Sequence, residues 1–102
     1  MVFCESVNEK LEPVKPSNAF TRGVITYVVH GKKIGASTLS IGLYKSLGSG
    51  DAESLIDQGS MTVNPEWSTY KNVVTLVAPG IYRVVLTRPD GSVFAQGSVT
   101  IQ

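Results

Sequence analysis

The density of β-branched residues, set between frequent glycines and prolines, most constrains what this chain can fold into. Val, Ile and Thr supply 28 of the 102 residues, and these side chains fit a pleated strand better than a helix. Ten Gly and five Pro leave few uninterrupted windows for a helix. The best window, residues 51–58, is shorter than the roughly 12 residues at which an isolated helix is even marginal. The sequence therefore predicts an all-β chain.

Size, charge and cysteine content narrow the classes of protein that remain. A chain of 102 residues can bury one core, so residues 1–102 are predicted to form a single domain. A formal net charge of +1 argues against a nucleic-acid partner. One cysteine excludes an intrachain disulfide. No apolar run reaches the roughly 18 residues that cross a bilayer, so membrane insertion is not expected.

Alternating apolar and polar residues, separated by Gly, Pro and Asn turn signals, predict about seven short antiparallel strands. Residues 1–19 should hold a first strand at 2–7 and an extended, proline-containing connector. The remaining strands are expected at residues 24–30, 38–45, 54–63 (one or two short strands), 70–77, 81–87 and 92–101. Turn signals roughly every 8–12 residues are typical of a two-sheet sandwich.

The C-terminal hairpin carries the most specific local signals. Pro89 and Gly91 stand where a type I turn with a glycine bulge requires them. On the return strand one face is expected to hold Val93, Ala95, Gly97, Val99 and Ile101. The side chains predicted to form the core lie on the inward faces of their strands: Tyr27, Leu39, Ile41, Val74, Leu76, Tyr82, Val84, Leu86 and Val99.

The same hairpin resembles the last hairpin of immunoglobulin-like and fibronectin-III-like β-sandwiches. The likeness lies in residues 79–84, the turn at 89–91 and the alternating strand at 95–101. It implies a two-sheet Ig-like sandwich in which Tyr82 takes the tyrosine-corner position and bonds back to the backbone. It implies no particular activity, because fold analogy does not transfer chemistry.

The N-terminal third is similar to the opening segment of small bacterial immunoglobulin-like domains of unassigned function. Pro13 and Pro16 form an extended stretch that leads to Phe20 and Thr21 and then to a Tyr-containing strand at 24–29. With this segment the resemblance covers most of the chain from Leu11 onward.

No residue set in the sequence points to catalysis or to a metal site. His30 is the only histidine and precedes a polar Gly-Lys-Lys loop, so it is expected at a loop edge without a catalytic role. Cys4 lacks the nearby positive charge that activates a thiol and is expected to pack inside the first strand. One His and one Cys cannot supply the four ligands of a structural zinc site. We therefore expect no enzyme activity, no cofactor and no metal.

Three aromatic side chains with polar groups are the candidates for partner binding: Trp67, Tyr70 and Tyr44. The alternative for Trp67 is that it caps the core beside the turn at Pro65. The resemblance, together with the lack of a catalytic residue set, suggests a non-catalytic binding or structural module. The alternative is a protease inhibitor that presents a loop, residues 46–52 or 30–37. Two glycines in each loop count against the preorganisation that tight inhibition needs.

The compartment and the sheet edges complete the expectations. The resemblance implies a piece of an exported bacterial protein, periplasmic or at the cell surface, with the cytoplasm as the alternative. The N-terminus lacks a signal-peptide pattern, which is expected if the chain is cut from a longer precursor.

Protein partners should bind through end loops or a sheet edge. The uncharged last strand is expected to be covered by the N-terminal segment or to pair with another chain, as in a homodimer. The alternative is that residues 2–7 pair with it inside one monomer.

Overall fold

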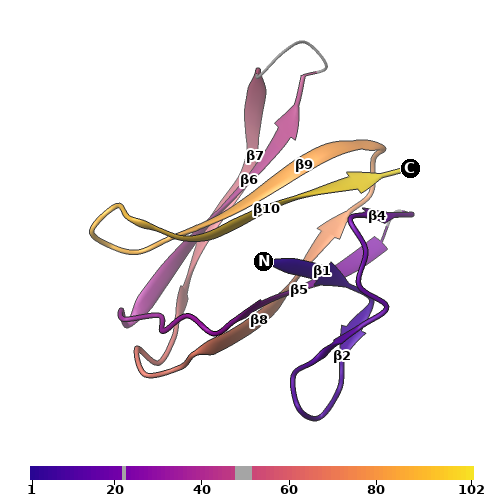
Figure 1. The fold of residues 1–102 in the computed structure, drawn as a ribbon. Helices are drawn as coiled ribbons and strands as arrows, with labels where there is room; N and C mark the ends of the chain where they lie inside the picture. Colours follow the sequence, from indigo (N-terminus) through magenta and orange to yellow (C-terminus); the bar gives the residue numbers. More distant parts are fainter. Residues whose placement is uncertain (22, 48–51) are drawn as a thin grey trace.

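The computed structural model describes residues 1–21, 23–47 and 52–102, and within them the chain is all-β (Figure 1). Ten strands form three sheets in this part of the chain, and no helix capable of crossing a membrane occurs in it. The strands are β1 (Val2–Cys4), β2 (Ser6–Val7), β3 (Pro13–Val14), β4 (Ala19–Phe20), β5 (Gly23–His30), β6 (Thr38–Ser46), β7 (Glu53–Thr62), β8 (Thr69–Leu76), β9 (Gly80–Thr87) and β10 (Val93–Ile101).

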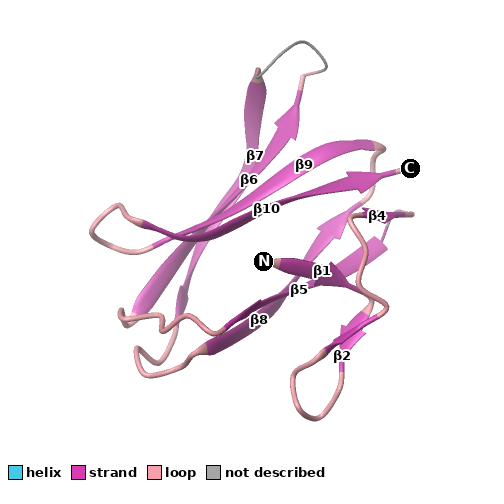
Figure 2. Ribbon diagram, in the orientation of Figure 1, coloured by secondary structure: helices cyan, strands magenta, loops and turns pink. Residues whose placement is uncertain are grey.

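Two of the sheets face each other in a sandwich-like arrangement (Figure 2). The larger sheet has the order β4-β10-β9-β6-β7, and the smaller has the order β1-β5-β8. A two-stranded ribbon, β2-β3, hangs from the smaller sheet. Neighbouring strands are antiparallel, except that β4 runs parallel to β10. Apolar side chains from the larger and the smaller sheet form one core cluster between these two sheets.

Seven of the nine predicted core residues are buried, which confirms the inward faces of five strands. The other two, Ile41 and Val74, are partly buried and pack against the core. Both line an open groove of about 320 Å³ between β7 and β8, where the sandwich is not closed by another strand. Their faces were therefore predicted correctly, but their depth depends on where the sheets end.

The hairpin signals are confirmed at atomic detail. Gly91 N–H donates to the Arg88 carbonyl at 2.9 Å, and Arg88 N–H donates to the Ser92 carbonyl at 2.8 Å. Gly91 has φ +91, a backbone conformation that glycine adopts at low cost. Tyr82 Oη donates to the Ala78 carbonyl at 2.7 Å, which is the backbone bond expected of that side chain.

The face predicted for the last strand is wrong at its beginning. The register between β9 and β10 shifts between Val93 and Ala95. This bulge, next to the turn, turns Phe94 into the core, where it is 1% exposed, and leaves Val93 47% exposed. Strict alternation from Ile101 backwards could not foresee the extra residue, because a bulge breaks the period of two.

The first predicted strand is divided in two. β1 pairs with β5, whereas β2 leaves that sheet and pairs with β3. Glu5 stands at the break, and its N–H donates to the Val14 carbonyl at 3.1 Å. The connector thus contains two short strands, β3 and β4, and the chain has more strands than the seven predicted. The one or two short strands expected at 54–63 are a single ten-residue strand, β7.

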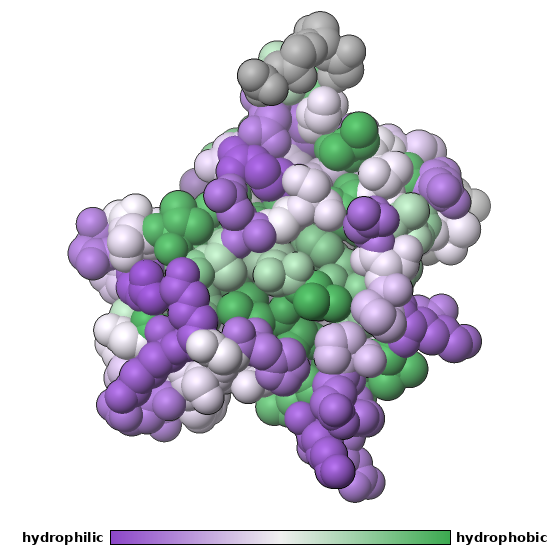
Figure 3. Space-filling model, viewed as in Figure 1, coloured by the Kyte–Doolittle hydropathy of each residue, from purple (hydrophilic) through white to green (hydrophobic). Residues whose placement is uncertain are grey.

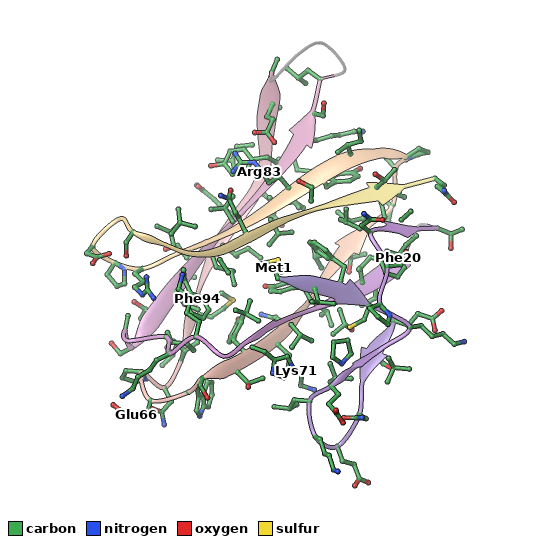
Figure 4. All side chains as sticks on the ribbon, viewed as in Figure 1. Met1, Phe20, Glu66, Lys71, Arg83 and Phe94 are labelled. Atoms are coloured by element: carbon green, nitrogen blue, oxygen red, sulfur yellow. The ribbon has the colours of Figure 1, made fainter. Side chains whose placement is uncertain are left out.

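The last strand is covered at its end by the N-terminal segment. β4 pairs with Thr100 and Ile101, and Lys32 Nζ donates to the Phe94 carbonyl at 2.7 Å near the other end of β10. The alternative in which residues 2–7 pair with this strand is wrong, because β1 pairs with β5. Between β10 and β1 the apolar side chains gather in the middle of the face shown in Figure 3, and Met1 lies there in Figure 4.

Candidate binding site around Trp67

Trp67 lies in the turn between β7 and β8, just after Pro65. The Asn64 side chain shapes this turn, because its Oδ1 accepts the Glu66 N–H at 2.9 Å. The Asn64 carbonyl accepts the Trp67 N–H at 3.1 Å. A side-chain oxygen that accepts a backbone N–H two residues on is a common way to fix a turn. The backbone beneath the indole is therefore held by its own sequence.

The neighbouring β5–β6 connection braces the same turn from the other side. Backbone N–H groups of residues 31, 34 and 35 donate to the carbonyls of Ser68, Trp67 and Pro65, at 2.9 to 3.0 Å. Ile34 is fully buried and anchors this connection in the core. Lys33 Nζ also lies 2.8 Å from Glu66 Oε2, although this ion pair is exposed. Trp67 is thus presented on two segments that hold each other in place.

An open hollow of about 570 Å³ lies beside the indole. Its lining residues are Leu11, Glu66, Trp67, Ser68, Thr69, Tyr70 and Lys71. Trp67 is 48% exposed, so half of a large apolar side chain faces solvent at the rim. Glu66 and Lys71 provide opposite charges, one on the turn and one on β8 (Figure 4). The hollow offers an aromatic surface with charged groups near it.

His30 joins the two walls of this hollow. Its Nε2 lies 2.7 Å from the Leu11 carbonyl, and its Nδ1 lies 3.2 Å from Thr69 Oγ1. A carbonyl only accepts, so in the neutral ring Nε2 carries the proton and Nδ1 accepts from the threonine hydroxyl. Both ring nitrogens are therefore engaged in holding the connector against β8.

The Leu11 wall depends on an unusual backbone conformation. Leu11 has φ +59, which L residues other than Asn and Asp seldom adopt. Asn8 stabilises the loop around it, because Asn8 Oδ1 accepts the N–H groups of Lys10 and Glu12 at 2.9 and 3.0 Å. Together with the bond from His30, these contacts fix the Leu11 side of the hollow.

The structure brings two of the three candidate aromatic residues together. Trp67 and Tyr70 both line the hollow, but Tyr70 is only 6% exposed. The Tyr70 hydroxyl points to Met61 Sδ, 3.0 Å away, and accepts a hydrogen bond from Asn72 Nδ2 at 3.0 Å. Tyr70 therefore forms part of the floor. The alternative in which Trp67 caps the core describes only the buried half of its side chain.

Tyr44 lies elsewhere, on the outer face of the larger sheet. The Arg83 guanidinium sits 4.8 Å from the centre of its ring. Arg83 also bonds both carboxylate oxygens of Glu53, with Nη2 to Oε1 at 2.8 Å, and donates to Gln96 Oε1 at 2.9 Å. The hydrogen bonds from Arg83 hold the pKa of Glu53 below its usual value. The Tyr44 ring thus packs under Arg83, which links polar side chains of the neighbouring strands into a row across β7, β6, β9 and β10.

Sequence reasoning missed the wall of the hollow that comes from the connector. Leu11 has no aromatic or polar group that would attract attention, and its role depends on a fold contact with His30. The structural use of His30 was also not foreseen, although its position at a strand end was. The signal that could have suggested an ordered loop is Asn8, because asparagine favours turns that bond to its own side chain.

The remaining chemistry-bearing residue is Cys4, which is fully buried on β1. Burial raises the pKa of its thiol, and Sγ lies 3.7 Å from the Thr26 carbonyl. The thiol is therefore packed inside the protein, as the sequence predicted. Among residues 1–21, 23–47 and 52–102, no group of three or more His, Cys, Asp or Glu side chains could hold a metal ion.

Comparison with protein-family models, with curated proteins and with solved structures finds no match to this chain.

Proposed function

We propose that this chain is an immunoglobulin-like sandwich that acts as a non-catalytic, protein-binding module. The distribution of its seven longer strands supports the fold assignment. The first, second and fifth of them (β1, β5 and β8) form one sheet, and the third, fourth, sixth and seventh form the other. Chains that pass between two sheets in this interleaved order are typical of Ig-like sandwiches. The bond from Tyr82 to the Ala78 carbonyl is a second point of support.

The observation that carries the binding function is Trp67, half exposed on a doubly braced turn beside a hollow. Exposure of a tryptophan costs hydrophobic free energy, and tryptophan is among the residues most enriched at binding hot spots. A rigid support lowers the conformational entropy lost on binding. The partner is a protein segment that covers the indole and fills the hollow with an apolar or cationic side chain.

Binding without catalysis agrees with the state of the two side chains best suited to chemistry. His30 uses both ring nitrogens in contacts with Leu11 and Thr69, and Cys4 is buried. A nucleophile or general base needs a group that can reach a substrate. Placement in an exported bacterial protein is part of the proposal and depends on the sequence resemblance alone.

The protease-inhibitor alternative has less support. In the 30–37 loop Ile34 is fully buried and its carbonyl accepts Arg88 Nε at 2.7 Å, so this loop is tied down along its middle. An inhibitory loop must present an extended segment to the protease. The other candidate, residues 46–52, lies largely outside the described residues.

The sole tryptophan makes the binding proposal directly testable. We expect peptides selected from a displayed random library against the full chain to change Trp67 fluorescence on binding. Their affinity should fall at least tenfold in Trp67→Ala, because a central aromatic anchor contributes roughly 2 kcal/mol or more. Val77→Ala, at a 69% exposed position away from the hollow, is the matched control and should bind normally. Selected peptides that bind Trp67→Ala as tightly as the parent chain would overturn the proposal.

A further inference from the structure

Sheet edges differ sharply in how well this chain protects them. An edge strand presents N–H and C=O groups that can pair with another chain, so most proteins cover or charge their edges. The five-stranded sheet ends at β7 on one side and, on the other, at β10 with the short strand β4 paired to it. The three-stranded sheet ends at β1 and at β8. In the part of the chain that the structure describes, one of these four edges is left open.

Three of the four edges are blocked in part. β10 is covered by β4 at one end and by Lys32 at the Phe94 carbonyl. On β1, the Phe3 carbonyl accepts the Ser17 N–H at 2.9 Å. On β8, Asn72 Oδ1 accepts the Val73 N–H at 2.8 Å, and Lys71 places a charge on the strand. Lysine on the strand and cover by another segment are usual protections of an edge.

The fourth edge, β7, is long and open. In the part of the chain that the structure describes, β7 pairs with β6 alone. Of its ten residues, all but Met61 are exposed. The hairpin of β6 and β7 projects past the rest of the larger sheet, away from the smaller one (Figure 1). β7 contains no Lys, Arg or Pro, and within it Asp57 Oδ1 caps the Gln58 N–H at 2.9 Å.

The ladder defines which main-chain groups of β7 face outward. Val63 N–H donates to the Ser37 carbonyl at 2.9 Å, so residue 63 faces β6. Successive residues of an antiparallel strand alternate in the direction of their N–H and C=O groups. The register is regular from Leu43 to Thr38 of β6, so the alternation holds over this half of β7. The main-chain groups of Gln58, Ser60 and Thr62 therefore point away from the molecule.

We propose that β7 of a second copy of this chain pairs with β7. The two strands run antiparallel about a two-fold axis, so that the five-stranded sheets of the two copies form one continuous sheet. In the register that uses all three outward residues, Ser60 lies opposite its own counterpart and Gln58 lies opposite Thr62 of the second copy. Such pairing forms about six main-chain hydrogen bonds, because each hydrogen-bonded pair exchanges two. Asp57 releases the Gln58 N–H, which exchanges one bond for another.

Charge explains why the occupant is a second copy and why this register is favoured. The only charged residues of β7 are Glu53 and Asp57, and Glu53 is already bonded to Arg83. In the Ser60-centred register Asp57 lies opposite residue 63, and Glu53 lies beyond the paired segment. A register centred closer to the hairpin tip would place Asp57 opposite Glu53 of the second copy, and like charges directly opposite are destabilising. The neutral stretch from Gln58 to Thr62 thus matches itself.

The test is the association state of the full chain, measured by light scattering from low micromolar to near-millimolar concentration. The parent chain should form a concentration-dependent dimer. Ser60→Lys places two ammonium groups across the two-fold axis and should weaken dimerisation at least tenfold. Thr75→Lys, on the exposed face of edge strand β8, is the matched control and should dimerise like the parent.

A cross-linking variant tests the register independently of the association constant. Opposite residues in a hydrogen-bonded pair have Cα atoms about 5.5 Å apart, which is within disulfide range. Ser60→Cys should therefore form a covalent dimer on mild oxidation, whereas Thr75→Cys should not, and the buried Cys4 does not compete. A parent chain that stays monomeric at every concentration would overturn the proposal. A dimer that Ser60→Lys leaves unchanged, or that Ser60→Cys does not cross-link, would overturn it equally.

Discussion

The Tyr27 ring lies in the core, 6.4 Å from the ring centres of Phe3 and Tyr70. Its hydroxyl is the buried side-chain polar atom without a hydrogen-bond partner among the described residues. Burial, with Tyr70 beside it, raises the pKa of Tyr27, so the hydroxyl stays protonated across the range in which proteins fold. A buried polar group without a partner destabilises the folded state.

Removing this hydroxyl should therefore not weaken the protein. Tyr27→Phe should leave the free energy of unfolding unchanged or raise it by about 1 kcal/mol. Tyr82→Phe is the matched control, because it removes a bond to the Ala78 carbonyl and should cost about 1 kcal/mol. Urea unfolding of both variants measures the difference. A larger loss for Tyr27→Phe than for Tyr82→Phe would contradict this account of the two hydroxyls.

The Glu53 carboxylate predicts a pH dependence of stability. Hydrogen bonding to Arg83 lowers its pKa in the folded state, so the unfolded chain binds the proton more readily. The stabilisation is present above the unfolded pKa of about 4.3 and is lost as the pH falls through the lower folded pKa. Glu53→Gln should therefore destabilise the chain at neutral pH, and its difference from the parent should shrink in acid.

Thermal unfolding at neutral pH and at about pH 2 measures this effect. Glu66→Gln is the control, because the Lys33–Glu66 pair has both side chains more than half exposed and should contribute little at either pH. A Glu53→Gln difference that stays constant with pH would show that the Arg83 contact does not depend on the carboxylate charge.

At the scale of the element, β8 separates core from surface along one strand. Leu76 is 2% exposed, whereas Val73, on the same strand, is 51% exposed. Leu76→Ala should lower the free energy of unfolding by about 2–4 kcal/mol through lost burial and the cavity that remains. Val73→Ala should change it by less than about 0.5 kcal/mol. Equal losses at the two positions, measured by urea unfolding, would mean that the faces of β8 are assigned wrongly.

At the scale of the whole molecule, Lys32 links the segment between β5 and β6 to the edge of β10. Its ammonium group donates to the Phe94 carbonyl at 2.7 Å and lies 5.7 Å from the centre of the Phe94 ring. Lys32→Ala should lower the free energy of unfolding by about 1 kcal/mol, because a charge-assisted bond is lost. Lys33→Ala loses an exposed ion pair and should cost at most about 0.5 kcal/mol.

Hydrogen exchange gives the second measurement on the Lys32 variant. The amides near the start of β10 should exchange faster in Lys32→Ala than in Lys33→Ala, because the variant uncovers that edge. Equal exchange in the two variants would mean that Lys32 does not protect β10.

The candidate site shows what sequence reasoning could and could not find. Trp67 was a candidate because aromatic side chains with a polar group are enriched at interfaces. Tyr44 was a candidate for the same reason, because it is also an aromatic side chain with a polar group. In the structure, however, Arg83 on a neighbouring strand covers its ring. Leu11 could not be identified, because its place beside the hollow depends on a contact with His30, which is distant in the chain. Which aromatic residues remain available is decided by neighbours that are distant in the chain.

The sequence by itself determined where the longer strands from β5 to β10 lie. The alternation on β6, β8 and β9, the β-forming run of β5 and the turn at Gly91 act through neighbouring residues, and these predictions were confirmed. The tertiary structure alone decided which strands pair, that the first strand divides at Glu5, and that β7 pairs with β6 alone among the described residues. The physical reason is range. Backbone preference and side-chain period are local properties, whereas strand pairing and burial depend on segments that meet only when the two sheets close over one core.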